Sequence, residues 1–221
     1  MDQEIINSYS IIKDLNVSRE TFIDFEEFIS LVNKKNKEIN LISKKNEENI
    51  NIRERHIIDS AQIIDFIDLN SISITDLGSG SGMPGLIIAI MLKNMKKDIK
   101  INLYEKSHHK SHFLRDVSKK LNLNTEVFQK NIFELNNLKT GTIMSRAFKP
   151  MPIVLDLVYK NFSNFKNLIF FMGANGKKIF RETLDDWDLE FSKKKSLTNE
   201  DSFLLNVKKI SKKNKKRYKK N

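Results

Sequence analysis

The chain has 221 residues, a length that suits one folded domain with a short appendage and leaves little room for two full domains. A hydrophobic fraction of 39% argues against a disordered chain, and the lack of cysteine excludes disulfides, thiolate nucleophiles and cysteine-bound zinc. An acidic start and short apolar runs argue against secretion and membrane insertion, so we expect a cytoplasmic protein whose net charge of +11 suits an acidic partner.

Two amphipathic helices are predicted before the first strand. Behind Ser18, which suits an N-cap, apolar side chains recur at steps of three and four. They are Phe22, Phe25, Ile29 and Val32. A second helix is predicted over residues 53–66, and the Lys- and Asn-rich residues 33–51 form a polar connection. We therefore assign residues 1–70 to an N-terminal helical extension packed on the core.

From Ile72 onward, short apolar runs alternate with helical patterns, which is typical of βαβ units and a mostly parallel sheet. Strands are predicted at residues 72–77, 99–104, 125–128, 141–145 and 167–172, and helices at residues 85–96, 110–121, 152–161 and 177–184. Two final runs, residues 187–193 and 203–210, predict an antiparallel hairpin. The fold class is therefore α/β, with a doubly wound domain over residues 71–210.

The basic excess is concentrated at the C-terminal end. Nine Lys or Arg and no acidic residue lie between Lys208 and Asn221, and without those nine the remaining 30 basic residues nearly balance 28 acidic ones. Such an arm suits a phosphate backbone, but a solvated solubility tail has the same composition. The basic tail, residues 211–221, is therefore either an RNA-docking arm or a solubility tail.

The most informative segment is DLGSGSGMPG, residues 76–85, placed where a buried strand meets a helix. Glycines there can adopt positive φ and carry no Cβ, so a ligand can lie directly on the backbone at a helix N-terminus. In an α/β protein this is a nucleotide-type site at the carboxyl ends of parallel strands.

Two cofactors compete for this loop. Gly80, Gly82 and Gly85 form a dinucleotide fingerprint, and Glu105 follows at the distance expected of a residue that binds the ribose of either cofactor. Asp76, directly ahead of the first glycine, favours S-adenosylmethionine, because a carboxylate there would lie near the positively charged methionine end. A pyrophosphate would gain nothing from it. The alternative role for Asp76 is that of a turn or cap carboxylate.

Six blocks of the sequence occur in an order that resembles one known family. They are NKEINLI at residues 36–42, RHIIDS at 55–60, the glycine loop, YEKS at 104–107, FLR at 113–115 and SRAF at 145–148. Together they resemble the bacterial small-subunit (16S) rRNA guanine-N7 methyltransferase family, also called the glucose-inhibited division protein B family. The glycine loop alone fits many methyltransferases, whereas RHIIDS before it and SRAF after it are far more specific.

The resemblance implies a class I S-adenosylmethionine-dependent methyltransferase with a Rossmann-like fold. Its sheet would be seven-stranded and mostly parallel, with an antiparallel last strand, and would follow the N-terminal helices. The implied reaction is methylation of N7 of a guanine in 16S rRNA, and the implied partner is that RNA or the small ribosomal subunit.

The resemblance also implies site residues. Gly78, Met83 and Arg146 would contact S-adenosylmethionine, with Ile132 and Phe133 beside its adenine. To these we add three residues of the glycine-loop analysis, Asp76, Gly80 and Glu105. One departure is Met172, which stands where the family commonly has a lysine before glycine, so a role for that lysine in holding RNA is in doubt here.

Three side chains are candidates for positioning. Guanine N7 has an in-plane lone pair and no proton, so no catalytic base is required and alignment should supply most of the acceleration. Arg146 at a strand end could hold the cofactor carboxylate, which we favour, or an RNA phosphate, or make a surface ion pair. His56 and Asp59, three apart on a helix, could close over the cofactor, guide the RNA, or simply stabilise the helix.

No metal is expected. His108 and His112 have i,i+4 spacing, but no cysteine or suitably spaced acid joins them, and nearby lysines would oppose a cation. No self-complementary face is apparent, so we expect a monomer. Two other functions stay open: a nicotinamide-dependent oxidoreductase using the same loop, for which the sequence offers no Tyr–Lys pair near the strand ends, and a non-catalytic RNA-binding factor.

Overall fold

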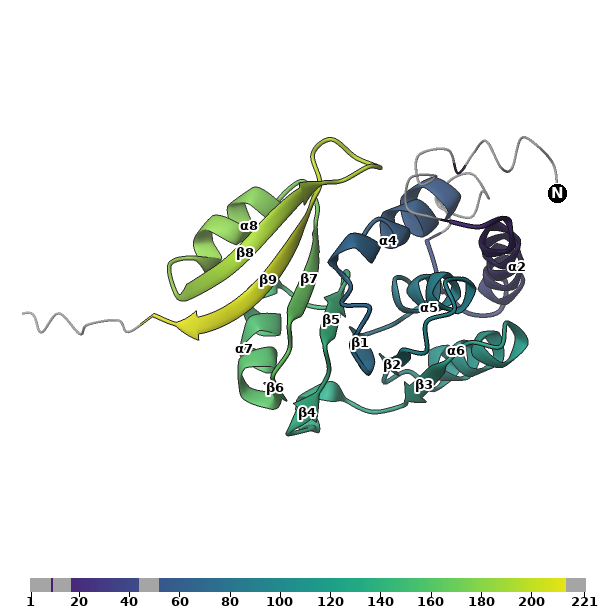
Figure 1. Ribbon diagram of the computed structural model, residues 1–221, viewed down its shortest axis with the longest axis horizontal. Coiled ribbons are helices and arrows are strands. Elements are labelled where there is room, and N and C mark those ends of the chain that lie inside the picture. Colours follow the sequence, from purple (N-terminus) through teal and green to yellow (C-terminus); the bar gives the residue numbers. More distant parts are fainter. Residues whose placement is uncertain (1–8, 10–16, 44–51, 214–221) are drawn as a thin grey trace, which may run out of the picture.

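The protein is built around a seven-stranded sheet in the order β3-β2-β1-β5-β7-β9-β8 (Figure 1). The computed structural model describes residues 9, 17–43 and 52–213. Its long strands are β1 (Ser73–Leu77), β2 (Lys100–Tyr104), β3 (Thr125–Phe128), β5 (Thr142–Ser145), β7 (Asn167–Met172), β8 (Trp187–Lys195) and β9 (Phe203–Lys212). Neighbours pair in parallel except at β9, which runs antiparallel to both β7 and β8. The predicted sheet is therefore confirmed.

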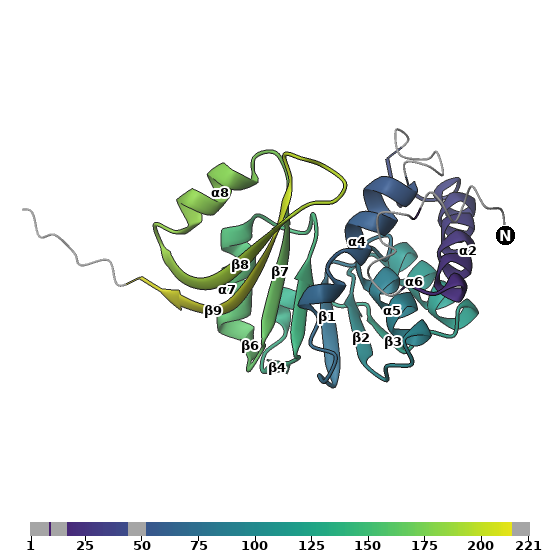
Figure 2. The same cartoon turned by 45° about the horizontal axis from the view of Figure 1, so that its top comes forward.

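Helices cover both faces of this sheet (Figures 1 and 2). One face carries α5 (Gly85–Asn94) and α6 (His108–Lys120), on which α2 (Arg19–Asn36) packs, and the other carries α7 (Met151–Asn161) and α8 (Gly176–Thr183). Because successive side chains of a strand point to opposite faces, the strands separate two apolar cores. Ile143 joins the core beneath α7, and its neighbour Met144 joins the core beneath α5. The carboxyl ends of the parallel strands are left for ligands.

The first predicted helix is confirmed, and the second is wrong as a continuous helix. The Ser18 hydroxyl caps α2 by accepting from the Thr21 N–H. Residues 53–66 instead form a π-helical turn η3 (Arg53–Ile58), one α-helical turn α4 (Asp59–Ala61) and a 3₁₀ turn η4 (Ile64–Phe66). Their apolar side chains are buried on several faces, so tertiary packing rather than a single amphipathic stripe sets the backbone.

The remaining predicted elements are confirmed within two residues at each end. A short parallel pair, β4 (Leu138–Lys139) with β6 (Phe162–Ser163), was not predicted, because two-residue strands show no periodicity. Strand β9 runs to Lys212, so the first residues of the predicted tail belong to the sheet, while 214–221 lie outside the described residues. Within the described ranges, no helix is long and apolar enough to traverse a bilayer.

Candidate functional site

A cleft of about 660 Å³ opens at the carboxyl ends of β1, β2 and β5. It brings together eight of the residues singled out in the sequence. They are His56, Gly78, Gly80, Met83, Glu105, Ile132, Phe133 and Arg146. Asp76 and Asp59 do not line it. These residues come from five separate stretches of the chain, so the cleft depends on the sheet order and not on any one motif.

The glycine loop between β1 and α5 folds over the cleft with its backbone exposed to it. Gly78 and Gly80 have φ of +69° and +56°, the left-handed region that side chains disfavour. A Cβ on Gly78 would meet the Phe148 ring at 2.2 Å, whereas a Cβ on Gly80 would find nothing nearer than 3.7 Å. Gly78 is therefore needed for close packing, and Gly80 leaves open space above the backbone.

Asp76 lies beneath this loop rather than in the cleft. Its side chain is fully buried, and its Oδ2 accepts a hydrogen bond from the Gly85 N–H at 3.1 Å. Burial raises the pKa of Asp76 to about 7. This geometry matches the turn-carboxylate role that the sequence left open, and direct contact of Asp76 with a cofactor stays a prediction.

Glu105 joins the end of β2 to the glycine loop. Its Oε2 accepts from the Gly80 N–H at 3.0 Å, and its Oε1 accepts from the Ser107 N–H at 2.8 Å. Each carboxylate oxygen can accept a further hydrogen bond, and the side chain lines the cleft. Glu105 can therefore hold the loop and still accept hydrogen bonds from ligand hydroxyls.

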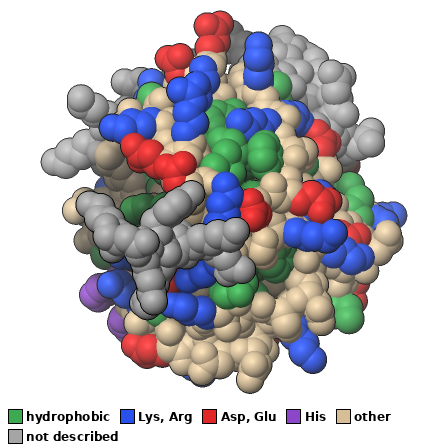
Figure 3. Space-filling model, turned by 90° about the vertical axis from the view of Figure 1, so that its left-hand side faces the viewer, with side chains coloured by type: hydrophobic (Ala, Val, Ile, Leu, Met, Phe, Trp, Pro, Cys, Tyr) green, Lys and Arg blue, Asp and Glu red, His purple; other side chains and the backbone are tan. Residues whose placement is uncertain are grey.

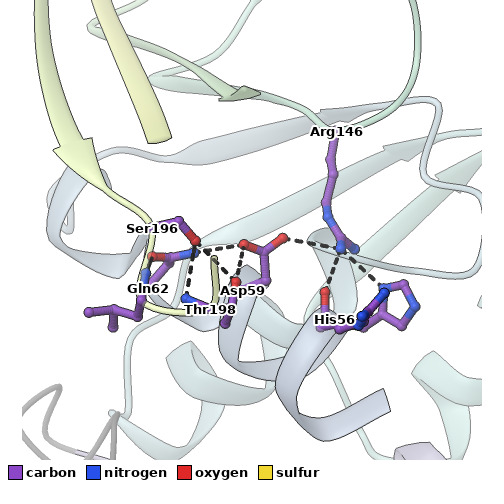
Figure 4. Close-up of polar contacts among 8 residues, drawn as sticks. His56, Asp59, Gln62, Arg146, Ser196 and Thr198 are labelled. Atoms are coloured by element: carbon purple, nitrogen blue, oxygen red, sulfur yellow. Dashed lines mark hydrogen bonds and ion pairs between the residues drawn. The ribbon is translucent and has the colours of Figure 1, made fainter. Parts of the chain in front are cut away.

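Arg146 is held through one guanidinium nitrogen (Figure 4). Its Nη2 donates to the Arg55 carbonyl at 2.7 Å and to His56 Nδ1 at 3.1 Å, and lies 3.1 Å from Asp59 Oδ2. Within the described part of the chain, its other two nitrogens make no hydrogen bond, and the guanidinium lies 5.7 Å from the centre of the Phe171 ring. The guanidinium of Arg146, which lines the cleft, therefore still has free N–H donors.

His56 is neutral in this arrangement. Because arginine only donates, His56 Nδ1 must accept, which places the ring proton on Nε2. Burial, together with the nearby charges of Arg146 and Arg55, lowers the pKa of His56 to about 4. Nε2 is buried, and no described residue accepts its proton. His56 thus adds a further unused donor to the site and carries no positive charge.

Asp59 balances the charge of Arg146 in a largely buried pair, with each side chain 17% exposed. Burial raises the pKa of Asp59 and lowers that of Arg146, and the attraction between them opposes both shifts. The sequence placed Asp59 and His56 on one helical face, and the structure brings both to Arg146. The sequence had no signal for Gln62 and Thr198, whose side chains also donate hydrogen bonds to Asp59.

A second, smaller cleft of about 360 Å³ adjoins the first and shares Ala147 and Lys149 with it. Met172, the position of the predicted departure, lines this second cleft at the end of β7 and is 7% exposed. At this position the wall is a thioether, although Lys149 lines the same cleft, and the effect of Met172 on RNA binding stays a prediction.

Four lysines that the sequence analysis did not assign to the site line the first cleft. They are Lys106, Lys110, Lys130 and Lys149. The described part of the chain offers none of them an acidic partner within ion-pair distance. Among the described residues, no group of three or more His, Cys, Asp or Glu side chains is arranged to hold a metal ion. His112 instead lies 3.5 Å from Asp116 on α6.

A parallel sheet closed by one antiparallel strand, with a glycine-loop cleft at its carboxyl edge, defines the class I Rossmann-like methyltransferase fold. A putative O-methyltransferase from Klebsiella pneumoniae has this fold with a TM-score of 0.57 at 9% identity, covering 92% of this chain and 96% of that one. A SAM dependent methyltransferase from Aquifex aeolicus gives 0.55 at 12% identity, covering 74% and 95%.

The chain belongs to the rRNA small subunit methyltransferase G family, whose sequence model matches residues 22–209. It is 64% identical to the ribosomal RNA small subunit methyltransferase G of Pelagibacter ubique (strain HTCC1062), over 96% of this chain and all of that protein. Its identity to the protein of the same name from Ruegeria pomeroyi is 33%, over 87% and 93%. The family resemblance and fold predicted from the sequence are confirmed, and the nicotinamide-dependent alternative is not retained.

Proposed function

We propose that this protein transfers a methyl group from S-adenosylmethionine to N7 of a guanine in 16S rRNA. The observation that carries the proposal is the open glycine-loop cleft at the carboxyl ends of β1 and β2, in a chain of the methyltransferase G family. The relatives named above carry the name of ribosomal RNA small subunit methyltransferases. The N7 position is the one that the family resemblance implies.

The cleft has the features that S-adenosylmethionine requires. The open space above Gly80 admits a ligand against the backbone, and Glu105 can accept hydrogen bonds from ribose hydroxyls. The free nitrogens of Arg146 suit the carboxylate of the methionine part. Met83, Ile132 and Phe133 supply apolar surface for the adenine. S-adenosylmethionine itself supplies an activated methyl group on a sulfonium.

Methyl transfer to N7 requires little of the protein beyond placing the methyl donor and the guanine in line. In the proposed transfer the N7 lone pair would form the new bond to the methyl carbon as the carbon–sulfur bond broke, which would leave the positive charge on the purine. No proton moves, so neutral His56 need not act as a base. Arg146, with His56 and Asp59 holding it, fixes one end of the cofactor, and alignment supplies the acceleration.

The charge distribution supports RNA binding at the cleft rather than at the hairpin. Figure 3 shows the side of the molecule that lies on the left in Figure 1, where the β8–β9 hairpin is, and basic and acidic side chains are interspersed on it. Several lysines of the β8–β9 hairpin pair with acids, for example Lys209 with Glu190 and Lys212 with Asp156. Lys130 and Lys149 at the cleft have no such partner among the described residues, so they are available to phosphates.

The test is to incubate naked 16S rRNA and small ribosomal subunits, both lacking the modification, with labelled S-adenosylmethionine, and then to map the labelled base. Cleavage chemistry specific for N7-methylguanine identifies the atom. Label at one guanine N7 supports the proposal, and the Arg146→Ala variant serves as the inactive control. Salt-dependent RNA binding without cofactor binding would instead support a non-catalytic RNA-binding factor. A cytoplasmic monomer is part of the same proposal, and sedimentation of the purified protein tests the monomer.

A further inference from the structure

The turn between β8 and β9 lies against the segment that carries His56 and Asp59, although more than 130 residues separate them in the sequence (Figure 4). The Leu197 N–H donates to Gln62 Oε1 at 2.9 Å, and Gln62 Nε2 donates to Ser196 Oγ at 3.3 Å. Gln62 is fully buried. The hairpin turn is therefore joined to this segment by partly buried hydrogen bonds, which hold geometry better than fully exposed ones.

Asp59 connects that turn to Arg146, because its two oxygens face opposite partners. Oδ2 faces Arg146 Nη2, while Oδ1 accepts from Gln62 Nε2 at 2.8 Å and from the Thr198 hydroxyl at 3.2 Å. A carboxylate held on both sides cannot rotate, so it presents Oδ2 to a single guanidinium nitrogen. The other nitrogens of Arg146 then keep a fixed direction at the cleft.

We propose that Thr198 and Gln62 are positioning residues for the cofactor: through Asp59 they orient Arg146 toward the carboxylate of the methionine part. The inference rests on the proposed function, since it needs Arg146 to contact that carboxylate. The hairpin turn thereby becomes part of the cofactor site without touching the ligand. A turn that only fastened the hairpin to the helical segment would affect stability but not which part of the ligand is bound.

The experiment uses two ligands that differ in the methionine part. S-adenosylhomocysteine carries the amino acid, and 5′-methylthioadenosine lacks it. Calorimetric titration of the full-length protein with each ligand is compared for the wild type, Thr198→Val, Thr198→Ala and Thr198→Ser. Ser192→Ala removes an exposed hydroxyl on β8 that makes no side-chain hydrogen bond to any described residue, and it is the matched control. Arg146→Ala shows the loss expected when the contact with the ligand carboxylate is removed.

Thr198→Val and Thr198→Ala should weaken S-adenosylhomocysteine binding roughly three- to ten-fold, the range for one lost hydrogen bond, and leave 5′-methylthioadenosine binding unchanged. Thr198→Ser should restore the wild-type value, and Ser192→Ala should match it. Equal losses for both ligands, or none for either, would overturn the inference. So would an Arg146→Ala variant that fails to distinguish the two ligands. If the wild type binds no S-adenosylhomocysteine, the proposed function itself is contradicted, an outcome distinct from a failure of the positioning role alone.

Discussion

Replacing Gly78 by alanine tests the packing of the glycine loop, and the same substitution at the neighbouring Gly80 is its control. Both residues have positive φ, so alanine at either position costs about 1–2 kcal/mol in backbone conformation. Only at Gly78 does the new Cβ also collide, at 2.2 Å from the Phe148 ring, and such overpacking adds about 1–3 kcal/mol. Gly78→Ala should therefore lower the free energy of unfolding by about 2–5 kcal/mol, and Gly80→Ala by about 1–2 kcal/mol.

Urea denaturation followed by circular dichroism measures both losses. For a chain of this length each kcal/mol corresponds to roughly 2–4 °C in Tm, so thermal unfolding provides a second measure. The Phe148 ring also lines the cleft and stacks on Phe133 at 5.9 Å between ring centres, so displacing it should abolish S-adenosylhomocysteine binding in Gly78→Ala. Equal destabilisation by the two substitutions, with binding retained, would refute the packing argument.

Asp59→Ala leaves the Arg146 charge unpaired in a largely buried position and should reduce the free energy of unfolding by about 3 kcal/mol, measured by urea denaturation. The pKa of His56 is about 4 in the folded chain, below its ordinary 6.5, so its contribution to stability is complete above pH 6.5 and is lost as the pH falls toward 4. His56→Gln should flatten that limb of the stability profile by up to about 3 kcal/mol, and an unchanged profile would contradict the assignment. Lys130→Gln should reduce the salt dependence of RNA affinity by about one unit of log–log slope, whereas Lys209→Gln, which removes an ion-paired lysine, should change it less.

The sheet could be predicted from the sequence because its strands carry their own signals. Strand β7 continues from Asn167 as an apolar run buried on both faces, and its predicted bounds, residues 167–172, match the structure. The same periodicity argument failed at residues 53–66. There, apolar side chains pack on several sides, and the backbone changes from π to α to 3₁₀ within fourteen residues.

Some residues of the candidate site could likewise be predicted from the sequence, and others could not. Gly78, Glu105 and Arg146 stand at strand ends, where the order of βαβ units brings them together at one cleft. The family resemblance singled out Gly78 and Arg146, the glycine-loop pattern singled out Glu105, and their contacts with a cofactor stay predictions. Thr198 could not be found, because nothing in its own neighbourhood indicates that the hairpin turn returns to Asp59. The sequence located Asp76 at the end of the first strand, directly ahead of the glycine loop. Whether its carboxylate faces the cleft or the loop depends on the path of the backbone around it.

The two carboxylates that hold the glycine loop affect how one cofactor molecule replaces another in the cleft. Asp76 binds the loop from below and Glu105 from the side, so the protein itself satisfies the N–H groups of Gly85 and Gly80. A ligand then meets a crevice already in its working shape and spends little of its affinity on ordering the chain. Exchange of spent for fresh cofactor can proceed without melting the loop, and hydrogen exchange at the Gly80 and Gly85 amides should be slow even in the ligand-free protein.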